Sequence, residues 1–196
     1  MTHYFKNDET LKSEFRKLIY KYEDNTFEFT SDLGVFSKDR IDFASKLLIE
    51  NYFKHGEQNK KILDVGCGYG LIGVTLAKIK KCDVTMIDVN KRALHLAKIN
   101  LKENNVEANV LESDIYENIT EKYDCIITNP PIRAGKKVYM TILQDAHKYL
   151  NESGELWFVM NKDHGVKTVI KELNVTYDLQ ILEKNKGFFV IICKNR

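Results

Sequence analysis

The segment from Ile62 to Gly70, which reads Ile-Leu-Asp-Val-Gly-Cys-Gly-Tyr-Gly, restricts the fold of this chain more than any other stretch. Its first four residues have the pattern of a buried strand, and the three glycines that follow predict a tight turn into a helix. In an open α/β sheet such a turn lies at the carboxyl ends of the strands, where ligands bind. The alternative is a tight turn that binds nothing, since glycines also serve turns alone.

Strand and helix patterns alternate from residue 61 to the C-terminus. We expect strands at residues 62–65, 84–87, 108–111, 125–128 and 155–160, and helices at residues 71–80, 91–104, 138–150 and 165–173. Two further apolar runs, at 178–182 and 188–193, are separated by five mainly polar residues and predict a hairpin. This order predicts an α/β, Rossmann-like fold, with a mostly parallel sheet, helices on both faces and an antiparallel C-terminal strand.

The N-terminal part permits two interpretations. Apolar residues at 18, 20, 22, 27 and 29 alternate with polar ones, which predicts a β-hairpin. Apolar residues at 11, 15, 18, 19 and 22 also fit one face of a helix, so a helix remains an alternative. Ser37 is expected to cap a helix that ends near Tyr52, with Phe36 and Ile41 as its hydrophobic staple.

Length and charge limit the organisation of the chain and its partners. A length of 196 residues, 43% of them hydrophobic, predicts a single domain with a real core. We divide it into an N-terminal hairpin and helix extension, 1–57, and a Rossmann-like core, 58–196. A net charge of +2 excludes binding to nucleic acid through bulk charge, so such a partner requires a local basic patch.

Cysteine spacing and hydropathy indicate the compartment. The cysteines at 67, 82, 125 and 193 form no C-x-x-C pair, so we expect neither a metal site nor a disulfide framework. The first ten residues are polar and mixed in charge, unlike a secretory signal. The longest apolar run, residues 188–193, is far shorter than the roughly 20 residues that span a bilayer. We therefore expect a cytoplasmic monomer with no metal and no membrane contact.

The acids around the glycine segment discriminate between two cofactor classes. Asp88 follows Gly66 by 22 residues, ends the next predicted strand, and can accept hydrogen bonds from both ribose hydroxyls of an adenosine. A dinucleotide site requires a glycine at position 71, which is Leu71 in this chain. Asp64, before the first glycine, would repel a pyrophosphate but suits a cation. S-adenosylmethionine, with its ammonium and sulfonium, is therefore favoured over NAD.

The tetrapeptide Asn129-Pro130-Pro131-Ile132 follows the fourth core strand and holds both prolines of the chain. Because proline cannot continue a central strand, the pair predicts a rigid corner at the ligand edge of the sheet. The side-chain oxygen of Asn129 and the carbonyl of Pro130 can each accept one hydrogen of an exocyclic amine, which aims the nitrogen lone pair at a methyl group. Carbon methylation of pyrimidines needs a thiolate instead, and Cys125 is interpreted as a core residue.

The glycine segment resembles motif I of class I S-adenosylmethionine-dependent methyltransferases. The resemblance implies a seven-stranded sheet and a contact between Asp114 and the cofactor's adenine amine; a helix N-cap is the alternative role for Asp114. The candidate cofactor-binding residues are Phe36, Asp64, Gly66, Cys67, Gly68, Gly70, Asp88, Val89, Asp114, Ile115 and Asn129.

The Asn-Pro-Pro-Ile corner resembles motif IV of the amino methyltransferases, which act on adenine N6, guanine N2 or a protein glutamine. Its residues Asn129, Pro130, Pro131 and Ile132 are the candidate catalytic set. Adenine and glutamine enzymes usually carry an aromatic residue at the last position, where it stacks on a flipped base. Together with residues 27–42, the corner is similar to the RsmC-like family of 16S rRNA guanine-N2 methyltransferases, from about residue 16 to the end. This similarity implies that Phe36 and Asp39 lie over the cofactor or the target base.

This family resemblance implies methyl transfer from S-adenosylmethionine to guanine N2 of 16S rRNA, with rRNA or the small ribosomal subunit as partner. Larger family members carry a second, degenerate half, so this chain resembles the catalytic half alone. The alternatives are an adenine-N6 or protein-glutamine methyltransferase, and a non-catalytic rRNA-binding assembly factor. The candidate RNA-binding residues lie in the 27–42 stretch, after the corner and after the fifth strand: Lys38, Arg133, Lys136, Lys137 and Lys162. They form either a local phosphate-binding patch or ordinary solvated surface cations.

Overall fold

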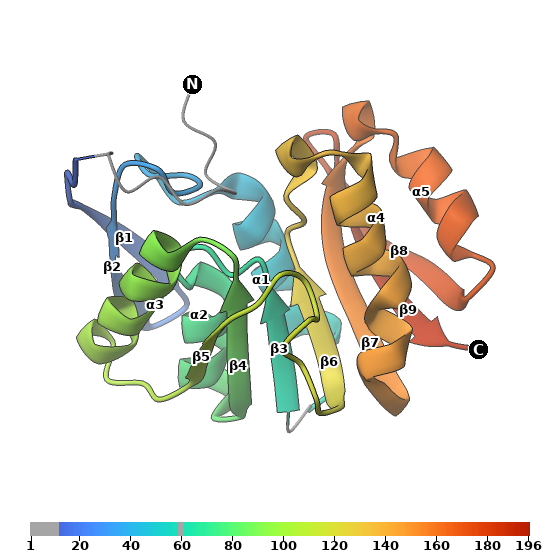
Figure 1. Cartoon of the computed structure of the whole chain (residues 1–196), viewed down its shortest axis with the longest axis horizontal. Coiled ribbons are helices and arrows are strands. Elements are labelled where there is room, and N and C mark those ends of the chain that lie inside the picture. The colour runs from blue at the N-terminus through green and yellow to red at the C-terminus, as the bar shows by residue number, and fades with distance from the viewer. Residues whose placement is uncertain (1–11, 59–60) are drawn as a thin grey trace.

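The computed structural model describes residues 12–58 and 61–196 (Figure 1). Residue 11 of the alternative helical stripe and the polar first ten residues lie outside the described part of the chain. The described part of the chain contains a two-stranded hairpin and a seven-stranded sheet.

The central sheet has the strand order β5-β4-β3-β6-β7-β9-β8. The first five strands in that order are mutually parallel, and β9 is antiparallel to both of its neighbours. The strands are β3 (Lys61–Val65), β4 (Asp83–Asp88), β5 (Asn109–Glu112), β6 (Tyr123–Thr128), β7 (Leu150–Asn161), β8 (Tyr177–Asn185) and β9 (Phe188–Asn195). This arrangement confirms the predicted Rossmann-like fold with its C-terminal hairpin.

Five α-helices cover the two faces of this sheet in the described residues. They are α1 (Phe43–His55), α2 (Leu71–Lys80), α3 (Lys91–Glu103), α4 (Lys136–Asp145) and α5 (Val166–Leu173). Side chains of α1, α2 and α3 share one core cluster with the hairpin, and those of α4 and α5 share the cluster on the opposite face. Because helices cover both faces of the sheet, nearly every residue of the central strands β3 and β6 is buried, and neither strand has a solvent-facing polar side.

The N-terminal hairpin is confirmed, and the alternative helix through residues 15–22 is wrong. Strands β1 (Arg16–Tyr22) and β2 (Asn25–Ser31) pair antiparallel across a two-residue turn. The hairpin lies beside α3 (Figure 1), and two asparagine side chains of that region hydrogen-bond to the backbone of β2 as a neighbouring strand would. The Asn100 side chain exchanges hydrogen bonds with the backbone of Thr30, and that of Asn104 does so with Glu28. This satisfies backbone groups at the hairpin edge.

The predicted helix cap at Ser37 is wrong. Helix α1 begins six residues later at Phe43, and Asp42 caps it by accepting a hydrogen bond from the Ser45 N–H. Ser37 lies in a turn with a positive φ of 54°, and its hydroxyl donates to the carbonyl of Arg40. Serine and aspartate cap helices about equally well, so the local sequence offered two starts. The predicted hydrophobic staple of Phe36 and Ile41 depended on a cap at Ser37, so it is wrong as well. Phe36 instead borders the cavity described below.

Two further boundaries differ from expectation. Helix α4 begins at Lys136 and ends at Asp145, after which the single-turn 3₁₀ segment η2 (Ala146–Tyr149) completes the predicted helical stretch. Strand β7 begins at Leu150 instead of residue 155 and runs to Asn161. No described helix has the length and apolar character needed to cross a membrane. The four cysteines carry free thiols, and the described residues contain no His, Cys, Asp and Glu cluster able to hold a metal ion.

Candidate active site

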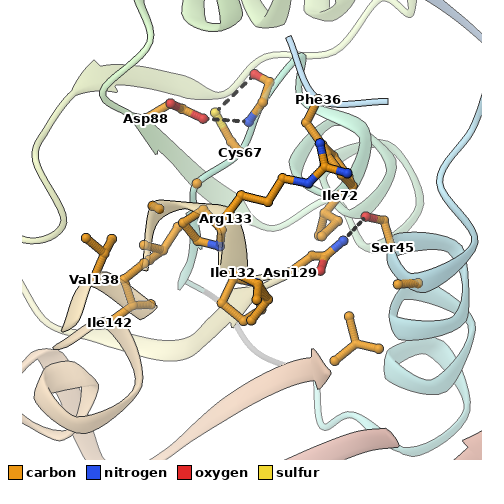
Figure 2. Close-up of a pocket in the computed structure, with 18 of the residues that line it drawn as sticks. Phe36, Ser45, Cys67, Ile72, Asp88, Asn129, Ile132, Arg133, Val138 and Ile142 are labelled. Atoms are coloured by element: carbon orange, nitrogen blue, oxygen red, sulfur yellow. Dashed lines mark hydrogen bonds between the residues drawn. The ribbon is translucent and has the colours of Figure 1, made fainter. Parts of the chain in front are cut away.

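A cavity of about 650 Å³ opens at the carboxyl ends of the parallel strands β3, β4 and β6. The glycine segment and the Asn-Pro-Pro-Ile corner both border it, because β3 and β6 are neighbours in the sheet (Figure 2). The Thr128 hydroxyl donates to the Val65 carbonyl over 2.7 Å and ties the ends of the two strands together. Two motifs that lie far apart in the sequence therefore share one site; the strand ends joined by this bond are 63 positions apart.

The glycine loop is held by backbone contacts and passes close to its neighbours. The N–H groups of Gly66 and Cys67 both donate to the Ile87 carbonyl, at 2.9 Å each. Gly68 has a φ of +56°, and a Cβ there would meet nothing within 4 Å, so it faces open space. Gly70, with a φ of +91°, begins α2, and a Cβ there would lie only 3.3 Å from the Ala97 Cβ. The loop therefore needs glycine at Gly70 for packing and at Gly68 for conformation.

Asp88 ends β4 and borders the cavity beside this loop. Its two oxygens accept from the N–H groups of Gly68 and Asn90, each at 2.9 Å, and Figure 2 shows the first of these bonds. Burial raises the pKa of Asp88, and these N–H donors oppose the rise. Each carboxylate oxygen has more than one acceptor position, so Asp88 can hold the loop and still accept from a ligand.

Asp64 lies behind the glycine loop and is not part of the cavity wall. One oxygen accepts from the Gly73 N–H over 2.9 Å, and the other, Oδ1, is buried with no hydrogen-bond partner among the described residues. Burial raises the pKa of Asp64 to about 7, with a smaller contribution from the charge of Asp88. An unpartnered buried carboxylate oxygen is costly, and a nearby cation would offset that cost.

The Asn129 side chain is the polar centre of the corner after β6. Its Nδ2 donates to the Asp42 carboxylate over 3.0 Å and to the Ser45 hydroxyl over 2.9 Å, and Figure 2 shows the contact with Ser45. A carboxylate can only accept, so it fixes which end of the amide faces α1. The Asn129 Oδ1 is therefore left on the side away from α1 as an acceptor.

The two prolines form a narrow turn. The Pro130 carbonyl accepts from the Ile132 N–H over 2.8 Å, around a Pro131 with φ −75° and ψ 78°, which is an inverse γ-turn. The carbonyl keeps a second lone pair. The single-turn 3₁₀ segment η1 (Ile132–Ala134) follows, and it places Ile132 in the cavity wall.

Most of the sequence-predicted cofactor residues border the cavity. Those in its wall are Phe36, Gly66, Cys67, Gly68, Asp88, Val89, Asp114, Ile115 and Asn129. Gly70 and Asp64 lie outside the wall and support the loop from behind. No helix follows Asp114 in the described structure, so it is not a helix cap. Ile115 has a φ of +53°, an uncommon conformation for a β-branched residue and one that accumulates at functional sites.

The candidate RNA-binding cations are less concentrated than the sequence indicated. Arg133 borders the cavity, and Figure 2 shows its side chain extending across the opening toward Phe36. Lys38, Lys136, Lys137 and Lys162 lie outside the wall. Lys136 pairs with Glu172 over 2.8 Å, and Lys38 pairs with Asp39 over 2.9 Å. Such exposed pairs are weak, so both lysines can exchange a carboxylate for a phosphate.

Sequence reasoning missed two residues of the site, Asp42 and Ser45. Their signal was present, because Asp-x-x-Ser at a helix start fits an N-cap with its partner three residues on. That signal was assigned to Ser37 instead. Asn161 and His164, after β7, also border the cavity and carried no recognisable motif. The buried Cys125 lies inside β6, and burial raises the pKa of its thiol well above the usual value, so it offers no nucleophile.

Comparison with known proteins identifies the family. Residues 26–192 match the family model described as "Methyltransferase small domain". The chain belongs to this methyltransferase family. It is 40% identical to the protein YbxB of Bacillus subtilis (strain 168), over 98% of both chains. It is 37% identical to the ribosomal RNA small subunit methyltransferase C of Buchnera aphidicola subsp. Cinara cedri, over 94% of this chain and 54% of the relative.

Solved structures support the same family assignment. The chain resembles the T. thermophilus 16S rRNA N2 methyltransferase RsmC, solved in complex with AdoMet and guanosine, with a TM-score of 0.83 and 25% identity. The match covers 95% of this chain and 52% of that one. A methyltransferase from Pyrococcus furiosus, at 18% identity and a TM-score of 0.68, supports the fold alone. The resemblance to RsmC-like class I methyltransferases is thus confirmed, and the chain spans about half the length of the methyltransferase C relatives it matches.

Proposed function

We propose that this chain transfers a methyl group from S-adenosylmethionine to an exocyclic amine of RNA, and that the amine is guanine N2 of 16S rRNA. One observation carries the proposal: Asp42 and Ser45 hold the Asn129 Nδ2, so its Oδ1 is presented as an acceptor beside the glycine loop. An amide acceptor on a rigid corner suits an amine nucleophile, which has hydrogens to donate.

The residues around the cavity fit S-adenosylmethionine in shape and charge. The glycine loop leaves open space at Gly68, and Asp88 beside it retains acceptor capacity for ribose hydroxyls. The buried Asp64 carboxyl behind the loop has an unpartnered oxygen and a pKa raised to about 7, so a cationic ligand would favour its ionised form whereas a pyrophosphate would oppose it. We assign the adenine contacts to Asp114, Val89 and Ile115, as the family resemblance implies.

When bound, S-adenosylmethionine supplies a methyl group on a positively charged sulfur. The amine nitrogen forms the new bond to the methyl carbon, the carbon–sulfur electron pair remains on sulfur, and one N–H proton leaves for water. The chain's own residues prepare the amine for this exchange. The Asn129 Oδ1 and the second lone pair of Pro130 O each accept one amine hydrogen, which localises the nitrogen lone pair and aims it.

Several features favour guanine over the alternatives. The most informative relatives are described as small-subunit rRNA methyltransferases, and the T. thermophilus structure contains guanosine and is described as acting at guanine 1207. Ile132 offers an apolar face to a base where the adenine and glutamine enzymes usually have an aromatic ring. The intact acceptor geometry at Asn129 argues against a non-catalytic assembly factor. Because rRNA is the proposed substrate, we propose a cytoplasmic enzyme, and we expect it to act as a monomer.

The test is methyl transfer from labelled S-adenosylmethionine to 16S rRNA and to small subunits purified from cells without the gene. Digestion to nucleosides followed by mass spectrometry is expected to yield N2-methylguanosine at a single site. Recovery of N6-methyladenosine would move the substrate to adenine, and label on a ribosomal protein would move it to a glutamine amide. If the cofactor bound but neither RNA nor protein acquired label, the proposal would fail in favour of the non-catalytic assembly factor.

A further inference from the structure

Asp42 is shared between the start of helix α1 and the Asn129 corner. One oxygen of its carboxylate, Oδ2, accepts from the Ser45 N–H over 2.7 Å and from the Asn129 Nδ2 over 3.0 Å. The first contact caps the helix, and the second crosses 87 positions of sequence. A helix cap needs only the first contact, so the second calls for a separate explanation.

Without a fixed partner, an asparagine amide can present either end to the cavity. The two orientations have nearly the same shape but opposite chemistry, because one presents an acceptor and the other an NH₂ donor. A donor facing an amine would repel its hydrogens instead of accepting them. The side chain of Asn129 is half-buried, so the environment around it decides between these orientations.

We infer that Asp42 and Ser45 are positioning residues that hold the Asn129 amide with its oxygen toward the methyl acceptor. This inference rests on the proposed function, since it assigns the reactive side of that site. Asp42 supplies the asymmetry, because a carboxylate cannot donate and therefore rejects the opposite orientation. Ser45 adds a second acceptor from the first turn of α1, at 2.9 Å. Selection of an amine over a carbonyl or an ether thus begins in the N-terminal extension, outside both recognised motifs.

Two substitutions separate positioning from capping. Serine and asparagine both cap helices well, so Asp42→Ser and Asp42→Asn should each keep α1 folded. Serine is too short to reach Asn129 as well, whereas asparagine keeps an oxygen that can accept from both groups. If Asp42 only caps the helix, the two variants should behave alike. If it positions Asn129, the serine variant should be the worse methyltransferase.

The expected order of kcat is wild type, then Asp42→Asn, then Asp42→Ser. We expect a loss of a few fold for asparagine and on the order of 10- to 100-fold for serine, the range that corresponds to losing one buried hydrogen-bond partner. Calorimetric affinity for S-adenosylmethionine should change less than threefold in both, because neither variant touches the glycine loop. The control is Asp178→Ser, which makes the same change at an exposed aspartate on β8 that pairs with Arg196.

A second readout does not depend on the substrate. In the free protein, the side-chain NH₂ resonance of Asn129, assigned with Asn129→Gln, should show slow hydrogen exchange that is retained in Asp42→Asn and lost in Asp42→Ser. If wild-type protein methylates nothing, the proposed function fails, while this resonance still tests the positioning role. Equal exchange in wild type and Asp42→Ser, or equal kcat in the two Asp42 variants, would overturn the inference.

Discussion

The glycine loop between β3 and α2 and the Asn129 corner after β6 border the same cavity, but they are built differently. The loop is local: its contacts run to residues on the adjacent strand, such as Ile87 and Asp88. The corner depends on Asp42 and Ser45, which precede it by more than 80 residues. A local motif can therefore hold a ligand, whereas the reactive orientation in this chain depends on tertiary structure.

This contrast predicts separable defects. Changes in the corner should reduce methyl transfer while the cofactor still binds, and changes in the loop should reduce cofactor binding first. If a single conservative change in either region reduced both methyl transfer and cofactor binding, the two regions would act as one unit.

The largest effect is expected for Asn129→Ala. Loss of the side-chain acceptor should lower kcat on the order of 100-fold or more, since an amine nitrogen would lose one of its two orienting partners. Affinity for S-adenosylmethionine, measured by calorimetry, should remain within a few fold. Asn109→Ala, at an exposed asparagine on the edge strand β5, is the matched control. A variant that binds no cofactor because it unfolds would contradict the assignment of Asn129 to the acceptor side.

The next effect concerns Asp88→Asn on the loop side. Asparagine has one oxygen where the carboxylate has two, so either Gly68 or Asn90 loses its acceptor and the ribose contact weakens. Affinity for S-adenosylmethionine should fall about 30-fold, or about 2 kcal/mol, while kcat at saturating cofactor changes little. Asp83→Asn, at the exposed start of the same strand, should bind normally. Unchanged affinity in Asp88→Asn would remove Asp88 from the cofactor site.

A smaller effect is expected in the pH dependence of stability. The pKa of Asp64 is raised to about 7, so between about pH 4 and pH 7 the folded protein holds a proton that the unfolded chain has released. Asp64 therefore makes the folded state less stable as pH rises through this window. Relative to Asp64→Asn, wild-type protein without ligand should lose on the order of 1–2 kcal/mol of unfolding free energy between pH 5 and pH 7. Thermal denaturation of both proteins across this pH range measures the difference. If the stabilities of wild type and Asp64→Asn changed in parallel with pH, the raised pKa assigned to Asp64 would be wrong.

The smallest effect is expected at the RNA surface. Arg133 borders the cavity, whereas Lys136 lies outside it and pairs with Glu172. Arg133→Ala should weaken binding to an rRNA fragment a few fold and reduce the salt dependence by about one charge, and Lys136→Ala should do less. Fluorescence anisotropy across a salt series measures both. A larger effect at Lys136 would move the RNA path away from the corner.

Much of the fold was predictable because local patterns agree with it. The helix at 71–80 and the C-terminal hairpin follow from apolar periodicity and from the turn residues between strands. The start of α1 was not predictable, since Ser37 and Asp42 are both good caps and the tertiary contact of Asp42 with Asn129 is not visible in the local sequence. The glycines and the two prolines located the cavity. The orientation of the Asn129 amide depends on a contact between distant segments, which a linear motif cannot reveal.

The most direct test of the central claim is a crystal structure of the protein with S-adenosylhomocysteine and guanosine. The account predicts the guanine N2 within about 3 Å of both the Asn129 Oδ1 and the Pro130 carbonyl oxygen, with the Asn129 Nδ2 still on Asp42. It also predicts that N2 faces the sulfur across the gap that a methyl group fills. An Asn129 amide turned with its Nδ2 toward the guanine, or a guanine N2 pointing away from the corner, would contradict it.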